Sequence, residues 1–123
     1  MGNDLAFVIE SCTLVNGLGS NGEAVIPTFT ITALIHGERK SEACAGKNSM
    51  DAIVKALRKL TGKDFDLKNI VMGEVQIGDG IQKTATVEIL HEGRRYKGDG
   101  CGSDHNEAAY YGWGNVLNQL YSP

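Results

Sequence analysis

The chain contains one internal duplication, and this feature limits the folds that it can adopt more than any other. A shift of 56 residues without gaps brings one half of the sequence onto the other across a strand-like stretch, a turn, a glycine-containing segment and a helix start. The matched residues are Thr28 with Thr84, Thr30 with Thr86, Ile31 with Val87, Leu34 with Leu90, Gly37 with Gly93, Arg39 with Arg95, Gly46 with Gly102 and Ala52 with Ala108. Two copies are too few for a solenoid, so the pattern favours one domain built from two similar halves. The alternative is a chance likeness between two short hairpin-and-helix units.

The end of the second half, residues 96–120, shows what each half contains. It reads as the end of a strand, a glycine-rich loop and an amphipathic helix expected over about 104–121. The helix is indicated by apolar residues that recur along one stripe, namely Ala109, Trp113, Val116, Leu117 and Leu120. Ser103 or Asp104 can cap this helix, and Asp104 with Glu107 three residues later resembles a capping box.

Both halves show the same order of expected elements. Stretches rich in β-branched and apolar residues predict the strands, at 5–15, 24–35 and 39–45 in the first half and at 67–77, 81–90 and 94–97 in the second. A helix capped by Asn48 or Ser49 ends the first half, with Gly62 suited to its C-terminal end. The sum is an α+β fold with antiparallel sheets and helices packed on one side. We expect a single domain over residues 1–123, made of two β-β-β-α repeats at about 5–62 and 66–121.

Composition and charge exclude several classes of partner. The net charge of −3 gives no basic patch for nucleic acid or for an anionic membrane. No apolar run approaches the ~20 residues that a membrane span needs, and residues 1–4 lack the features of a signal peptide. The three cysteines, Cys12, Cys44 and Cys101, are odd in number and widely spaced, so no disulfide framework is expected and a reducing cytoplasm fits. Each is predicted to be a small buried apolar residue, with a reactive thiol at a helix start as the alternative.

The sequence offers no convincing catalytic or metal-binding group. His36 and His91 are expected in solvent-exposed hairpin turns, and no histidine or cysteine spacing for zinc is present. Asp104 and His105 form the pair that most resembles a catalytic one, but no nucleophile is placed beside them and capping accounts for Asp104. We therefore predict no catalytic residue, no metal and no cofactor.

Two loops, 45–49 and 98–103, share a feature that suits a small acid. Each precedes a helix start, where backbone N–H groups and the helix dipole favour a carboxylate. Apolar residues at Met50, Ile70 and Ile81 are candidates for one wall of the site. An amphiphilic acid such as an amino acid is therefore the expected ligand.

The same two loops carry a family resemblance. Residues 46–52, GKNSMDA, resemble a GxGPVDA motif, and residues 98–104, GDGCGSD, resemble a GxGxSxD motif before a final helix that contains Asn118. Together they resemble the C-terminal regulatory domain of α-isopropylmalate synthase and citramalate synthase, the LeuA dimerisation domain, over nearly the whole chain. Asn48 and Ser49 depart from the glycine and proline of the first motif, and polar residues rather than apolar ones follow Asp104.

This resemblance implies a homodimer that binds leucine or isoleucine between subunits, so that the end product inhibits an acetyl-CoA-dependent synthase. The effector residues that it implies are Gly46, Asn48, Ser49, Met50, Asp51, Asn69, Ile70, Glu74, Ile81 and Lys83, with Gly100, Gly102, Ser103 and Asp104 in the second-repeat loop. The family's catalytic barrel is too long for this chain, so we interpret the chain as a regulatory domain without catalysis of its own. Two alternatives remain, a structural dimer that has lost the effector site and a small enzyme that uses Asp104 and His105.

Overall fold

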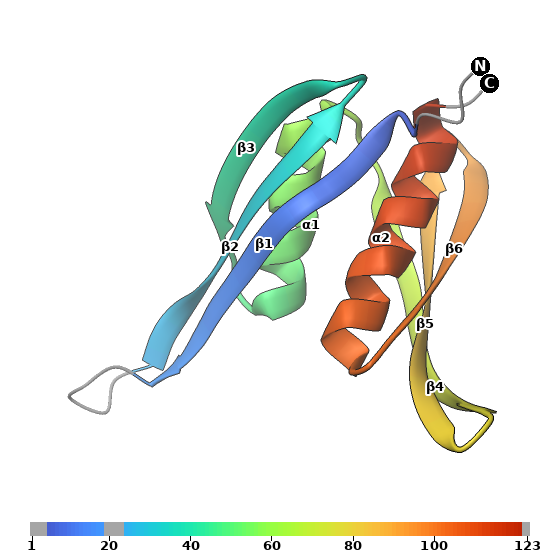
Figure 1. The fold of residues 1–123 in the computed structure, drawn as a ribbon. Helices are drawn as coiled ribbons and strands as arrows, with labels where there is room; N and C mark the ends of the chain where they lie inside the picture. Colours follow the sequence, from blue (N-terminus) through green and yellow to red (C-terminus); the bar gives the residue numbers. More distant parts are fainter. Residues whose placement is uncertain (1–4, 19–23, 122–123) are drawn as a thin grey trace. The chain divides into compact units, whose positions relative to one another are not determined.

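The computed structural model describes residues 5–18 and 24–121, which form three strands and a helix twice (Figure 1). The elements are, in order, β1 (Phe7–Leu18), β2 (Ala24–Ile35), β3 (Glu38–Ala45), α1 (Ser49–Thr61), β4 (Asp66–Ile77), β5 (Gly80–His91), β6 (Arg94–Gly102) and α2 (His105–Tyr121). The predicted α+β order of two β-β-β-α repeats is confirmed. The chain divides into two compact units, residues 8–64, here called the α1 unit, and residues 65–123 with the N-terminal residues to Phe7, here called the α2 unit.

Each unit has one antiparallel sheet, with strand order β1-β2-β3 in the first and β4-β5-β6 in the second. The eight cross-strand pairs between β2 and β3 recur between β5 and β6 with every residue number raised by 56. Thr28 pairs with Ala45, and at the equivalent position Thr84 pairs with Cys101. The internal duplication read from the sequence is therefore a duplication of strand register.

The two equivalent hairpin turns use the same backbone conformation. His36-Gly37 joins β2 to β3 and Glu92-Gly93 joins β5 to β6, and all four residues have positive φ angles between 51° and 81°. Positive φ at both central residues suits the right-handed twist of a two-residue hairpin. The prediction that His91 is an exposed turn residue is wrong, because His91 is the last residue of β5 and its side chain is only 15% exposed.

Each helix covers one face of its sheet. Helix α1 packs on β2 and β3, and its buried stripe consists of Ala52, Ile53, Ala56, Leu57 and Leu60. Helix α2 packs on β5 and β6, and Val87, Ile89 and Trp113 of these elements are buried. Phe65 adds to this second core, with its ring centroid 6.0 Å from that of Trp113. Burial of these apolar side chains is the main term that holds each helix on its sheet.

Glycines in β6 allow α2 to approach the sheet closely. Residues 98–102, expected as a glycine-rich loop, continue strand β6, so that prediction is wrong. A β-carbon at Gly98 would overlap the backbone of Val116, and one at Gly100 would overlap the carbonyl oxygen of Ala108. Gly112 of the helix is close to the sheet as well, because a β-carbon there would lie 3.0 Å from Val87 Cγ2. These glycines therefore allow close contact between the helix and the strand, and they do not form an irregular loop.

The three cysteines differ in their exposure. Cys12 and Cys44 are partly buried and Cys101 is exposed, so the prediction that each is buried is wrong for Cys101. Cys101 is next to Gly100, which faces α2, so the alternation of a strand places the thiol on the opposite face of the sheet. In the described part of the chain, no helix is long and apolar enough to cross a membrane.

Candidate functional site

The start of helix α1 is closed by side chains of the protein itself. Asn48 is the N-cap, and its Oδ1 accepts a hydrogen bond of 2.9 Å from the N–H of Asp51. In return, Asp51 Oδ2 accepts a hydrogen bond of 2.8 Å from the N–H of Lys47. That hydrogen bond, with a second contribution from Lys55, lowers the pKa of the Asp51 carboxyl below its ordinary value. A carboxylate therefore already sits at this helix start, and it belongs to Asp51.

Helix α2 starts with the same arrangement, 56 residues later. Asp104 Oδ1 accepts from the N–H of Glu107 at 2.8 Å, and Glu107 Oε1 accepts from the N–H of Ser103 at 3.0 Å. The predicted capping box is confirmed. At the two helix starts, the backbone N–H groups of Lys47, Asp51, Ser103 and Glu107 are thus bonded internally. The expectation that they hold the carboxylate of a ligand is wrong for these four groups.

The glycines before the two helices have a packing role. A β-carbon at Gly46 would overlap the backbone of Ala52, and one at Gly102 would overlap the side chain of Glu107. The N–H of Gly46 also donates to the carbonyl oxygen of Pro27 at 3.0 Å. The close approach of the first helical turn thus requires glycine at both positions.

The predicted effector residues fall into two groups that belong to different units. Gly46, Asn48, Ser49, Met50 and Asp51 lie at the start of α1, whereas Asn69, Ile70, Glu74, Ile81 and Lys83 lie on β4 and β5.

Four of the five residues on β4 and β5 share one face of the sheet. Directly opposed residues of antiparallel strands point to the same side. Ile70 is opposite the buried Val87, Glu74 is opposite Lys83, and Ile81 is two residues from Lys83 along β5. Asn69 is opposite Glu88 and lies on the other face. The face that carries Ile70, Glu74, Ile81 and Lys83 is the one on which α2 packs, and we call these four residues the hairpin face.

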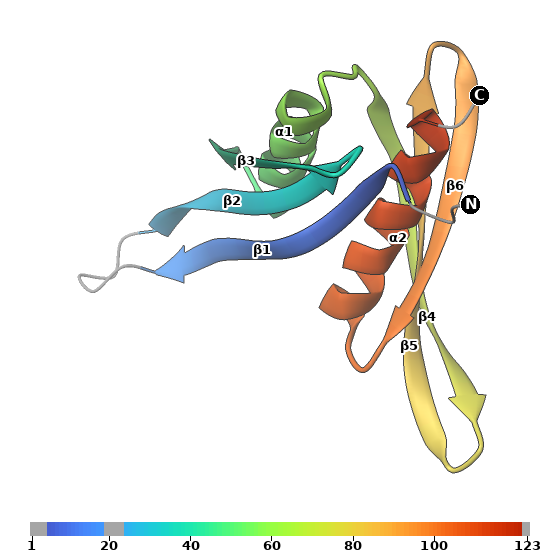
Figure 2. The same cartoon turned by 45° about the horizontal axis from the view of Figure 1, so that its top comes forward.

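Opposite charges and apolar surface lie together on the hairpin face. Lys83 Nζ donates to Glu74 Oε2, and this bond together with the charge of Lys83 lowers the pKa of Glu74, with a smaller contribution from His105. His105 Nε2, at the start of α2, lies 3.4 Å from the carbonyl oxygen of Gly73. Ile81 is 62% exposed. The β4–β5 hairpin projects beyond the start of α2, so the helix leaves this part of the face open (Figures 1 and 2).

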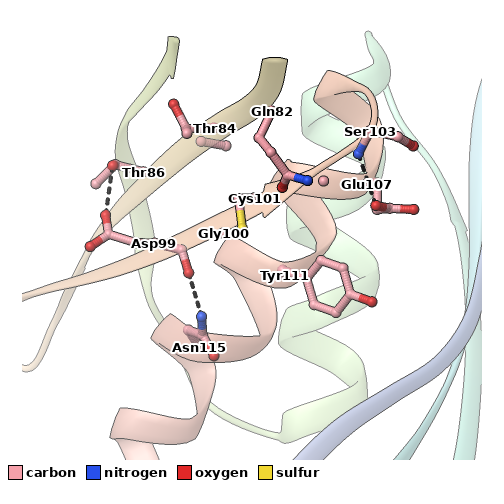
Figure 3. A pocket seen from close by; sticks show the side chains of 12 residues that line it. Gln82, Thr84, Thr86, Asp99, Gly100, Cys101, Ser103, Glu107, Tyr111 and Asn115 are labelled. Carbon is pink, nitrogen blue, oxygen red and sulfur yellow. Dashed lines mark hydrogen bonds between the residues drawn. The ribbon is translucent and has the colours of Figure 1, made fainter. Parts of the chain in front are cut away.

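A separate pocket of about 750 Å³ lies at the outer edge of β6 in the α2 unit (Figure 3). Its lining includes Gly100, Gly102 and Ser103 from the predicted second-repeat loop, but not Asp104. Polar side chains from β5, β6 and α2 complete it, namely Gln82, Thr84, Thr86, Asp99, Glu107, Tyr111 and Asn115. Sequence reasoning did not assign these residues, although Thr84 and Thr86 alternate along a strand, a pattern that places both on one face.

The hydrogen bonds of this pocket hold its rim together. Thr86 Oγ1 donates to Asp99 Oδ1 at 2.7 Å, and the side-chain amide of Asn115 donates to the carbonyl oxygen of Asp99 (Figure 3). Asp99 is thereby fixed both through its carboxylate and through its backbone. The pocket is open, and these contacts tie strand β6 to its neighbours.

Asp104 and His105, the pair that most resembles a catalytic one, make separate contacts. Asp104 caps α2, and His105 Nε2 points to the carbonyl of Gly73. Among the described residues, no group of three or more His, Cys, Asp or Glu side chains is placed to hold a metal ion.

Comparison with known proteins decides the family. Residues 6–121 match the family model described as the LeuA allosteric (dimerisation) domain. The chain is a member of this family. The matched range contains both glycine motifs and nearly the whole of both repeats, so the family resemblance read from these motifs is confirmed.

Curated relatives of this LeuA domain are named 2-isopropylmalate synthase. The one from Clostridium kluyveri is 33% identical over 100 residues, which cover 81% of this chain and 20% of the relative. The one from Syntrophus aciditrophicus is 32% identical over 81% of this chain and 19% of the relative. The Campylobacter jejuni protein is 27% identical over 94% of this chain and 21% of its own length. The LeuA domain described here thus spans about one fifth of the length of the curated relatives that it matches.

Proposed function

We propose that this chain is the regulatory and dimerisation domain of a cytoplasmic 2-isopropylmalate or citramalate synthase. In this proposal, it acts without catalysis of its own, forms a homodimer and binds a branched-chain end product, leucine or isoleucine. Binding inhibits an acetyl-CoA-dependent catalytic barrel, and the two repeats act as one domain. Membership of the LeuA family and the names of the relatives support this role.

The hairpin face is the observation that carries effector binding. A free branched-chain amino acid presents an ammonium group, a carboxylate and an apolar side chain. The hairpin face offers an anionic group in Glu74, a cationic group in Lys83 and an apolar side chain in Ile81. The Glu74 carboxylate is charged at neutral pH, and its pairing with Lys83 lowers its pKa further. Recognition of such a zwitterion requires a charged partner for the ammonium group, another for the carboxylate, and apolar contact for the side chain.

The residues at the start of α1 belong to the other unit, and they stay in the proposal as a separate group of candidate effector residues. Asn48 and Asp51 also hold the helix cap, so their variants change helix stability as well as any binding. Residues Gly100, Gly102, Ser103 and Asp104 of the second repeat remain in the proposal as the equivalent positions, and three of them line the pocket of β6. For these reasons, the hairpin face provides the sharper test.

The deciding experiment measures ligand-dependent stability and heat. We expect leucine or isoleucine to raise the melting temperature, with a gain of about 2.7 kcal/mol at about 100 times Kd, and alanine to leave it unchanged. Titration calorimetry on Lys83→Met should show loss of this binding. Arg95→Met is the matched control, because Arg95 also pairs with a carboxylate across β5 and β6 but lies outside the hairpin face. A binding loss of equal size in both variants would contradict the assignment.

A purely structural dimerisation domain is the second candidate. The backbone groups already bonded at both helix starts favour it, because they leave fewer donors for an effector. Native mass spectrometry showing a dimer, together with no heat for any amino acid, would select this candidate over the first.

A further inference from the structure

Strand β4 is the uncovered edge of the second sheet. Within its unit, α2 packs on β5 and β6 and leaves β4 beyond it (Figure 2). Large apolar side chains are exposed on both faces of this strand. Val71 and Val75 lie on one face at 55% and 44% exposure, and Met72 lies on the other at 45%. Exposed apolar clusters of this kind mark interaction surfaces.

At the opposite edge of the sheet, helix α2 forms hydrogen bonds with the backbone of β6. Asn115 donates its side-chain amide to the carbonyl oxygen of Asp99, and Gln119 donates its own to that of Lys97. Both bonds occupy backbone acceptors of β6. In the other unit, edge strand β3 carries four charged residues among its eight, Glu38, Arg39, Lys40 and Glu42. Covered and charged edges resist pairing with another chain.

From residue 69 onwards, strand β4 has neither form of protection. From residue 69 to residue 77 its ladder with β5 runs without interruption, and the single irregularity in register lies between Leu67 and Asn69. Glu74 is the only charged residue in this stretch. A regular and nearly uncharged edge strand is a template for a further strand.

We infer that the chain dimerises by antiparallel pairing of β4 with β4 of a second copy, which joins two three-stranded sheets into one. This inference rests on the proposed dimerisation and names its surface. Pairing at an edge brings side chains together on both faces of the new strand pair, which accounts for apolar residues on both sides of β4. A partner that docked on one face would cover either Val75 or Met72 and leave the other in water. A second copy fits because antiparallel pairing of one strand with itself satisfies twofold symmetry.

The test compares lysine substitutions on the two faces. Val75→Lys and Met72→Lys should each raise the dimer dissociation constant about 100-fold, because twofold symmetry places each new charge in the interface twice. Ile26→Lys, on β2 at a side chain that is 66% exposed, is the matched control and should leave the constant unchanged. Sedimentation equilibrium gives the constants, and circular dichroism confirms that each variant is folded.

Hydrogen exchange on the unmodified chain gives an independent measurement. Amides of residues 69–77 should gain protection as protein concentration rises through the dimer constant, whereas those of 38–45 should not. A dimer that weakens with only one of the two β4 variants, or with neither, overturns edge pairing and leaves the proposed dimerisation in place. A wild-type chain that stays monomeric at all concentrations contradicts both.

Discussion

Gly100 of β6 lies directly beneath Ala108 of α2, so close that a β-carbon on Gly100 would overlap the carbonyl oxygen of Ala108. Neither group can move without displacing backbone. We therefore expect Gly100→Ala to lower the free energy of unfolding by about 3 kcal/mol through overpacking, measured by urea denaturation.

Gly114→Ala is the contrasting substitution. A β-carbon at Gly114 meets no atom within 4 Å, and the residue lies inside α2. Alanine should therefore stabilise the chain by about 1 kcal/mol through helix propensity. Loss of stability in this variant would mean that the surroundings of the helix differ from those described.

The two helix caps should be equivalent in energy. Asn48→Ala and Asp104→Ala each remove the side-chain acceptor of an N-cap, and each should cost about 1 kcal/mol of unfolding free energy. Asn106→Ala, an exposed substitution in the first turn of α2, serves as the control and should change stability by less than about 0.5 kcal/mol. A large effect at one cap and none at the other would argue against the structural repeat.

The charge of Asp51 should make stability depend on pH. Its pKa in the folded chain lies below the ordinary value of 3.8, so its contribution is present above that value and is lost as the pH falls through the folded pKa. Asp51→Asn keeps a hydrogen-bond acceptor but not the charge. The variant should be less stable than the wild type at pH 7, and the difference should shrink below about pH 4. Melting temperatures of both chains across this range give the test, and a constant difference would contradict it.

Trp113 provides a reporter for the core of the α2 unit. Its side chain is 2% exposed and its ring packs against Phe65. Phe65→Ala should cost about 3–5 kcal/mol and shift the tryptophan emission to longer wavelength as water reaches the ring. Tyr111→Ala removes an aromatic ring that is 59% exposed and should leave both measurements nearly unchanged.

The elements that the sequence predicted well depend on local signals. The caps at Asn48 and Asp104 were found because a capping residue and an acidic partner three residues later act within a single turn of helix. The duplication predicted two similar halves. The structure shows that these halves also share strand register, because the glycines at positions 37 and 93 allow the same hairpin turn and the turn fixes the pairing of the strands that it joins.

Other features depended on contacts that no local pattern shows. Residues 98–102 read as a loop because glycine has a low strand propensity, yet they form the end of β6 because they pair with β5. The close approach of α2 is the reason that Gly98 and Gly100 are glycines.

By itself, the sequence determined the order of the elements, the repeat, the caps and the family, because these follow from residue types at fixed spacing along the chain. Only the tertiary structure decided which residues share a face, such as Glu74 with Lys83, and which edge of the sheet is left open. Those properties follow from strand pairing and from where each helix lies on its sheet, which bring together residues that are distant in sequence.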